Sequence, residues 1–117
     1  MLAGKHNFVI EQGQDWERLI TWYTEAGSPK ALLGGTAQMV IRPYYGHTGT
    51  AYKIMTSGSG ITLGNATSNI KLVLTDVETA TMDFLRAVYV LEVTLSTVKY
   101  RVLEGEILLA KDCTDVE

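Results

Sequence analysis

The chain has 117 residues, of which 46% are hydrophobic and 20% are charged, and its formal net charge is −3. This length predicts a single domain over residues 1–117, with flexible termini at 1–5 and 112–117. The acidic balance argues against binding to nucleic acid, which needs a basic face to neutralise phosphates, and against attachment to an anionic membrane surface.

The sequence favours folding in a reducing cytoplasm. Cys113 is the single cysteine, so an internal disulfide cannot form. The apolar runs are only a few residues long, which excludes a transmembrane helix. The first residues, Met1–Lys5, are too quickly polar for a signal peptide.

Alternation of apolar and polar residues at period two runs through most of the chain. In the first segment Phe8 and Ile10 alternate with Val9 and Glu11, and later segments repeat this pattern. Such alternation places one set of side chains on a core face and the other toward solvent. It predicts strands over residues 6–11, 16–24, 36–42, 51–56, 60–63, 69–75, 88–96 and 98–110.

The segments between these strands are rich in residues that form turns, such as Gly58-Ser59-Gly60 and Pro43–Thr50. Short strands separated by regular turns are typical of a sandwich or barrel. We therefore expect an all-β fold, an immunoglobulin-like antiparallel β-sandwich of about seven to nine strands.

One segment has a helical pattern. Thr75 and Glu78 have the spacing of a capping box, in which each side chain bonds to the other's backbone N–H. This predicts a short helix near 76–82 that crosses between the two sheets. In immunoglobulin-type sandwiches a tyrosine after such a crossing bonds back to the crossing backbone, and Tyr89 is placed to do so.

The last strand changes phase. Val98, Tyr100 and Val102 occupy even positions, whereas Ile107 and Leu109 occupy odd ones. One extra residue reverses the face of a strand, so a bulge near Gly105 would reconcile the two halves. A two-residue turn at the same place is the alternative.

The inventory of reactive groups is sparse. The two histidines, His6 and His47, have no cysteine or carboxylate at metal-ligand spacing. A nucleophile–base pair of Cys113 with either histidine is a minor alternative, and the acidic residues of 112–117 are expected to form a solvated tail. We expect no catalytic residue, no cofactor and no metal site, so the chain is predicted not to be an enzyme.

The aromatic residues are the candidates for an interface. Tyrosine and tryptophan are favoured at interfaces because one part of the side chain is apolar and another can hydrogen-bond. Tyr44 and Tyr45 lie in a predicted loop, and Trp16 follows a predicted turn. Phe8 and Ile10 belong to the first strand, which together with the last strand is a candidate open edge for partner strands.

An ordered set of short motifs resembles a known family. It comprises Phe8–Gly13, Trp16–Gly27, Leu32–Arg42, Ile61–Leu63, Ile70–Leu74, Glu78–Ala80, Tyr89–Val93 and Gly105–Ile107. This order is similar to the N-terminal domain of the upper baseplate proteins of tailed bacteriophages and to related small virion proteins. The resemblance covers about 100 residues, and the upper baseplate proteins continue into further helical and receptor-attachment regions beyond the part that these motifs match.

The resemblance implies a non-enzymatic phage virion protein, assembled in the host cytoplasm, that acts as a tail or baseplate adaptor. It would anchor receptor-binding fibres or spikes through repeated protein–protein contacts with other virion proteins. We expect a homo-oligomer in a symmetric assembly, without nucleic acid or membrane. The alternatives are a head-decorating cement protein and, in another class, a carbohydrate-binding module that uses Tyr44, Tyr45 or Trp16.

Overall fold

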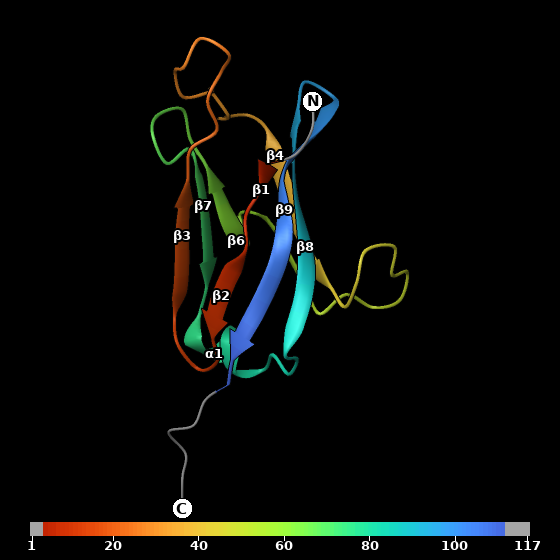
Figure 1. Ribbon diagram of the computed structural model, residues 1–117. Coiled ribbons are helices and arrows are strands. Elements are labelled where there is room, and N and C mark those ends of the chain that lie inside the picture. The colour runs from red at the N-terminus through yellow and green to blue at the C-terminus, as the bar shows by residue number, and fades with distance from the viewer. Residues whose placement is uncertain (1–3, 112–117) are drawn as a thin grey trace, which may run out of the picture.

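The computed structural model describes residues 4–111 and contains nine strands and one short helix in that range (Figure 1). In chain order the elements are β1 (Gly4–Lys5), β2 (Phe8–Glu11), β3 (Trp16–Ile20), β4 (Thr36–Arg42), β5 (Lys53–Ser57), β6 (Gly60–Leu63), β7 (Ile70–Leu74), α1 (Asp76–Ala80), β8 (Arg86–Leu95) and β9 (Val98–Ala110).

The strands form one curled sheet in the order β1-β9-β8-β4-β5-β6-β7-β3, and β2 also pairs with β9. Because the sheet curls, β3, β7 and β6 face β4, β8 and β9 as two layers (Figure 1). This confirms the predicted all-β, sandwich-like fold with one short helix. Most pairings are antiparallel, but β1 and β2 run parallel to β9, and β5 runs parallel to β6.

Side chains that point inward from both layers form the core. Alternate residues of most strands are buried, as the period-two pattern predicts, but β1 is exposed throughout and β3 buries only Trp16. Ten inward side chains of three strands are less than 9% exposed: Ala37, Met39 and Ile41 of β4, Ile70, Leu72 and Leu74 of β7, and Ala87, Tyr89, Leu91 and Val93 of β8.

The strand bounds differ from the predicted ones mainly at the start of the chain. Gly4 and Lys5, expected in a flexible terminus, form β1 and pair with Leu103 and Glu104. The strand expected over 16–24 ends at Ile20, and a separate turn follows it. Residues 60–63 and 98–110 form strands with the predicted bounds.

The helix α1 has the predicted capping box. The Thr75 hydroxyl accepts from the Glu78 N–H at 3.2 Å, and Glu78 Oε1 accepts from the Thr75 N–H at 3.0 Å. Lys53 Nζ lies 2.7 Å from Glu78 Oε2, and these hydrogen bonds hold the pKa of Glu78 below its usual value. No helix in the described part of the chain is long and apolar enough to cross a membrane.

The last strand contains the predicted bulge, but earlier in the strand. Leu91 pairs with Leu103 and Glu92 pairs with Arg101, so Val102 is the extra residue. The phase of burial changes from even to odd positions there. The strand continues unbroken past Gly105, so the alternative of a turn at this place is wrong.

The hydroxyl of Tyr89 bonds to the backbone, but not to the crossing segment around α1. It donates to the carbonyl of His6 at 2.6 Å, which corrects the expected corner tyrosine. Tyr89 lies directly opposite Gly105 across β8 and β9. The Tyr89 hydroxyl therefore holds the segment between β1 and β2 against β8 and β9.

The two-residue turn that joins β8 to β9 is strained by its sequence. Ser96 and Thr97 have φ values of 47° and 69°, a region that disfavours β-branched residues. We expect Thr97→Gly to raise the free energy of unfolding by about 0.5–1 kcal/mol, because the strain is relieved and only partly offset by backbone entropy. Urea denaturation would measure this. Thr94→Gly in β8 is the control and should lower stability, so a drop with Thr97→Gly as well would contradict the interpretation.

Candidate functional site

Part of the outer face of the β4–β8 pair is apolar, although most of its other outward side chains are polar or charged. Val40 and Val90 lie directly opposite each other and point away from the core, as does Val88. Ile54 of β5, opposite Val40, extends this row and is 50% exposed. The outer face of a sandwich is normally polar, so an apolar stripe here indicates a contact surface.

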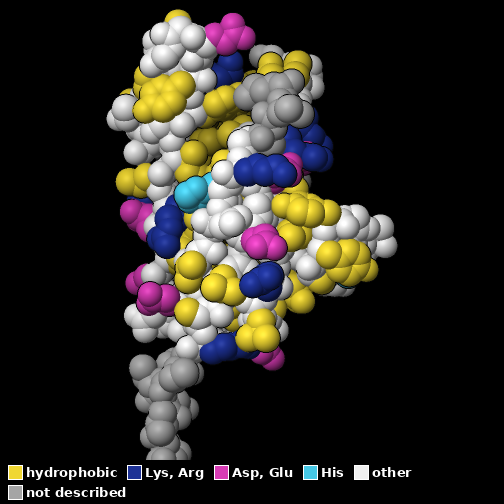
Figure 2. Space-filling model, viewed as in Figure 1, with side chains coloured by type: hydrophobic (Ala, Val, Ile, Leu, Met, Phe, Trp, Pro, Cys, Tyr) yellow, Lys and Arg dark blue, Asp and Glu magenta, His cyan; other side chains and the backbone are white. Residues whose placement is uncertain are grey.

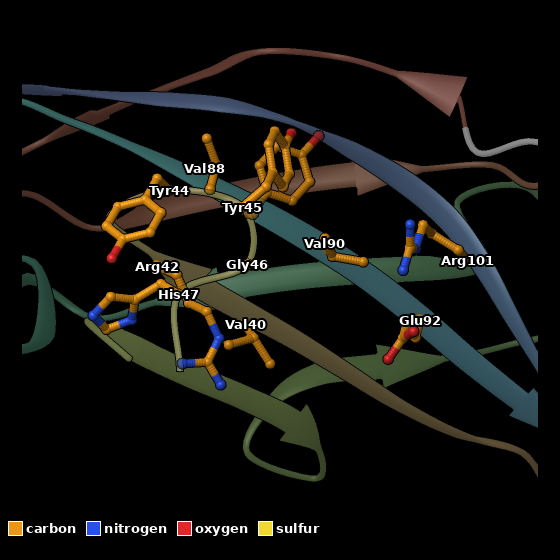
Figure 3. A pocket seen from close by; sticks show the side chains of 11 residues that line it. Val40, Arg42, Tyr44, Tyr45, Gly46, His47, Val88, Val90, Glu92 and Arg101 are labelled. Atoms are coloured by element: carbon orange, nitrogen blue, oxygen red, sulfur yellow. The ribbon is translucent and has the colours of Figure 1, made fainter. Parts of the chain in front are cut away.

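The loop between β4 and β5 projects over this stripe and forms a groove with it. The loop stands out from the side of the sheet and carries hydrophobic side chains at its surface (Figures 1 and 2). The groove has a volume of about 400 Å³. We call it the valine groove, lined by Val40, Arg42, Tyr44, Tyr45, Gly46, His47, Val88, Tyr89, Val90, Glu92 and Arg101 (Figure 3).

Two tyrosines form the wall of the valine groove. Tyr44 and Tyr45 are 60% and 52% exposed. The Tyr45 hydroxyl donates to the Gly105 carbonyl at 3.2 Å, and the Tyr44 ring meets His47 edge to face at 5.1 Å. Burial, together with Glu104 and Glu106, raises the pKa of Tyr45 above its ordinary value. The loop is thus held against the sheet rather than hanging free.

The charges at the two ends of the valine groove differ. At one end Arg42 Nη1 donates to the Gly49 carbonyl at 2.8 Å, and no carboxylate of residues 4–111 lies within ion-pair distance of its guanidinium. His47 Nδ1, in the same loop, is buried without a hydrogen-bond partner in the described range. At the other end Arg101 lies 3.8 Å from Glu104 and opposite Glu92.

Three of the five predicted interface residues are core residues instead. Trp16, Phe8 and Ile10 are 3%, 4% and 0% exposed. The Trp16 and Phe8 rings pack edge to face at 5.4 Å, and Trp16 Nε1 donates to the Val9 carbonyl at 3.0 Å. Their burial removes the sugar-stacking role considered for Trp16 and the docking role considered for Phe8 and Ile10. Only the Tyr44–Tyr45 pair stands at the surface as expected.

Of the two expected open edges, the first strand lies at an edge of the sheet as β2, whereas the last strand does not. The last strand, β9, is interior because it lies between β8 and the β1–β2 pair. The sheet ends at β1 and β2 on one side and at β3 on the other. The Val9 carbonyl of β2 accepts from Trp16 and from Arg18 Nη2 at 3.3 Å, so side chains of β3 cover part of this edge.

The floor of the groove was missed by sequence reasoning, although a signal for it existed. The period-two pattern assigns Val40 and Val90 to the solvent face. However, Met39–Ile41 and Ala87–Leu91 are uninterrupted apolar runs. Such runs are typical of strands covered on both faces. These two runs therefore indicate strands whose outer face can be covered by a loop or by a partner.

The described part of the chain contains no cluster of metal-binding side chains. No group of three or more histidine, cysteine or acidic side chains there is placed to hold a metal ion. His6 packs its ring against Phe8, whereas His47 packs against Tyr44. Cys113 and the acidic residues of the tail lie outside the described residues.

Comparison with known proteins adds no identity. A scan against protein-family models found no match. A search of the curated proteins also found no match to the chain.

Proposed function

We propose that the protein is a non-enzymatic structural component of a phage virion, an adaptor that holds neighbouring tail or baseplate proteins through the valine groove. The proposal is supported by the ordered motifs of the sequence and by the sandwich-like fold that they imply. It also agrees with a surface whose main feature is apolar rather than catalytic. Repeated copies in a symmetric particle would multiply a weak contact at each groove.

One observation carries the proposal: an apolar floor and two exposed tyrosines lie together on the outer face of a sheet. Val40, Val88 and Val90 are half-buried by the loop, yet they remain open to a groove of about 400 Å³. Exposed aromatic side chains around an apolar floor are the composition of protein-binding hot spots. A partner side chain placed on this floor would remove apolar surface from water, which favours association.

The test combines a groove variant with the location of the protein on the particle. The phage's gene for this protein is deleted, and the wild-type protein is supplied from a plasmid in the host. Purified particles are then examined by immunogold microscopy and mass spectrometry. Label at the tail tip or neck is expected. Label over the head would replace the adaptor with the cement protein, and absence from particles would refute the virion role.

The variant Val90→Lys is expected to reduce incorporation into particles at least tenfold, because it places a charge on the apolar floor. Position 90 lies directly opposite Glu104 of β9, so the lysine ammonium would be near a carboxylate and the fold should tolerate the change. Gln38→Lys is the matched control, since Gln38 is on the same outer face of β4 but does not line the groove. Equal incorporation of Val90→Lys and Gln38→Lys would show that the valine groove is not the docking surface.

A further inference from the structure

We propose that the valine groove binds a segment of a partner protein that places an apolar side chain on the floor and a carboxylate on Arg42. This inference rests on the proposed function, because it names the chemistry of the partner of the same groove. It assigns a residue that would bind the partner's charge, and it assigns the orientation of the partner in the groove.

The anchor is Arg42, which the structure holds in place but leaves without an acidic partner. Arg42 is the last residue of β4 and lies directly opposite Val88, so its guanidinium stands at the end of the apolar floor (Figure 3). The bond from Nη1 to the Gly49 carbonyl uses one of its donors. A guanidinium has five N–H groups in a planar fork, and this fork matches the two oxygens of a carboxylate.

The direction follows from the opposite end of the groove, where the cation is already compensated. Arg101 lies within 3.8 Å of Glu104 and opposite Glu92 in the register of β8 and β9. A carboxylate there would meet two like charges, whereas at Arg42 it would meet an uncompensated cation. The acidic group of the partner is therefore expected at the Arg42 end, with its apolar group over Val88 and Val90.

The same charges exclude a polyanion. Glu92, Glu104 and Glu106 follow β8 and β9 beside the groove. A chain of phosphates that reached Arg42 would continue past these carboxylates and be repelled. A single carboxylate next to an apolar side chain avoids this, and the volume of about 400 Å³ suits one or two such side chains.

The test uses a small probe that carries only the two proposed groups. The probe is 3-phenylpropionate, which has one carboxylate and one apolar ring, and its neutral isostere is 3-phenylpropanamide. Titration of the ¹⁵N-labelled protein is followed by amide chemical shifts. The wild type is expected to show saturable shifts in residues 42–49 and 88–90, with the acid binding about tenfold more tightly than the amide.

Two variants make the result specific. Arg42→Gln is expected to lower the affinity for the acid to that for the amide. Arg86→Gln, which changes an exposed arginine of β8 outside the groove, should leave the preference intact. Equal binding of acid and amide to the wild type would overturn the inference, as would an unchanged preference in Arg42→Gln or shifts confined to other surfaces.

The two proposals fail separately. If Val90→Lys is lost from particles while the wild-type protein shows no preference for the acid, the carboxylate inference is wrong and the docking groove stands. If the acid preference is present but the protein is absent from particles, the virion role is wrong and the carboxylate site stands.

Discussion

Replacing Gly105 with alanine is expected to lower the free energy of unfolding by about 3 kcal/mol or more. A Cβ at this position would lie 2.0 Å from the carbonyl oxygen of His6 and 2.8 Å from its carbonyl carbon. The obstacle is backbone, so no change of side-chain rotamer can make room. The segment between β1 and β2 would have to move away from β9, and the Tyr89–His6 hydrogen bond would break with it.

Urea denaturation measures the loss of stability, and amide hydrogen exchange locates it. Exchange in Gly105→Ala should accelerate first in Phe8–Glu11, because β2 depends on its pairing with β9. Gly64→Ala is the control, since a Cβ there has no neighbour within 4 Å and its φ is not positive. Similar midpoints for the two variants would show that the N-terminal segment does not require glycine at 105.

The features that the sequence predicts well are those that depend on neighbouring residues. Alternation of side chains defines most strands of the sandwich-like fold, and the Thr75–Glu78 capping box defines the start of the helix. The phase change in the last strand predicts a bulge, because an extra residue must reverse the face. Each of these signals lies within about ten residues, so pairings over long distances do not affect it.

The features that the sequence does not predict depend on contacts between distant residues. The parallel pairing of β2 with β9 joins residues about one hundred positions apart. It places the side chains of Phe8 and Ile10 in the core, although β2 itself lies at an edge of the sheet. The candidate site shows the same division. The Tyr44–Tyr45 loop is recognisable from its composition, but the loop becomes a groove only because it folds over Val88 and Val90, more than forty residues away.

Asn69 is a clear example of a residue whose role depends on contacts with distant residues. Its replacement by alanine is expected to have a large effect on stability. Its side chain is 1% exposed and connects three segments. Oδ1 accepts from the Trp22 N–H at 2.9 Å, and Nδ2 donates to the carbonyls of Trp22 and Lys30 at 3.0 and 2.8 Å. The short methyl group of alanine would satisfy none of these groups.

We expect Asn69→Ala to lower the free energy of unfolding by about 2–4 kcal/mol. Trp22 keeps a second donor for its carbonyl, the Lys30 N–H at 2.8 Å, so the unpaired groups are chiefly the Trp22 N–H and the Lys30 carbonyl. A fully buried group without a partner costs about 1–3 kcal/mol. Because these two bonds are only partly buried, the expected loss lies in the lower part of the summed range. Urea denaturation followed by tryptophan fluorescence measures the loss.

Asn65→Ala supplies the control for this prediction. Asn65 also accepts from a backbone N–H, that of Leu33 at 2.9 Å, but the bond is exposed and water can replace it. Its loss should cost no more than about 1 kcal/mol. If the two asparagine variants unfold at the same urea concentration, then burial of the Asn69 network does not stabilise the loops that follow β3, and those loops must be held by the packing of Trp22 against the core.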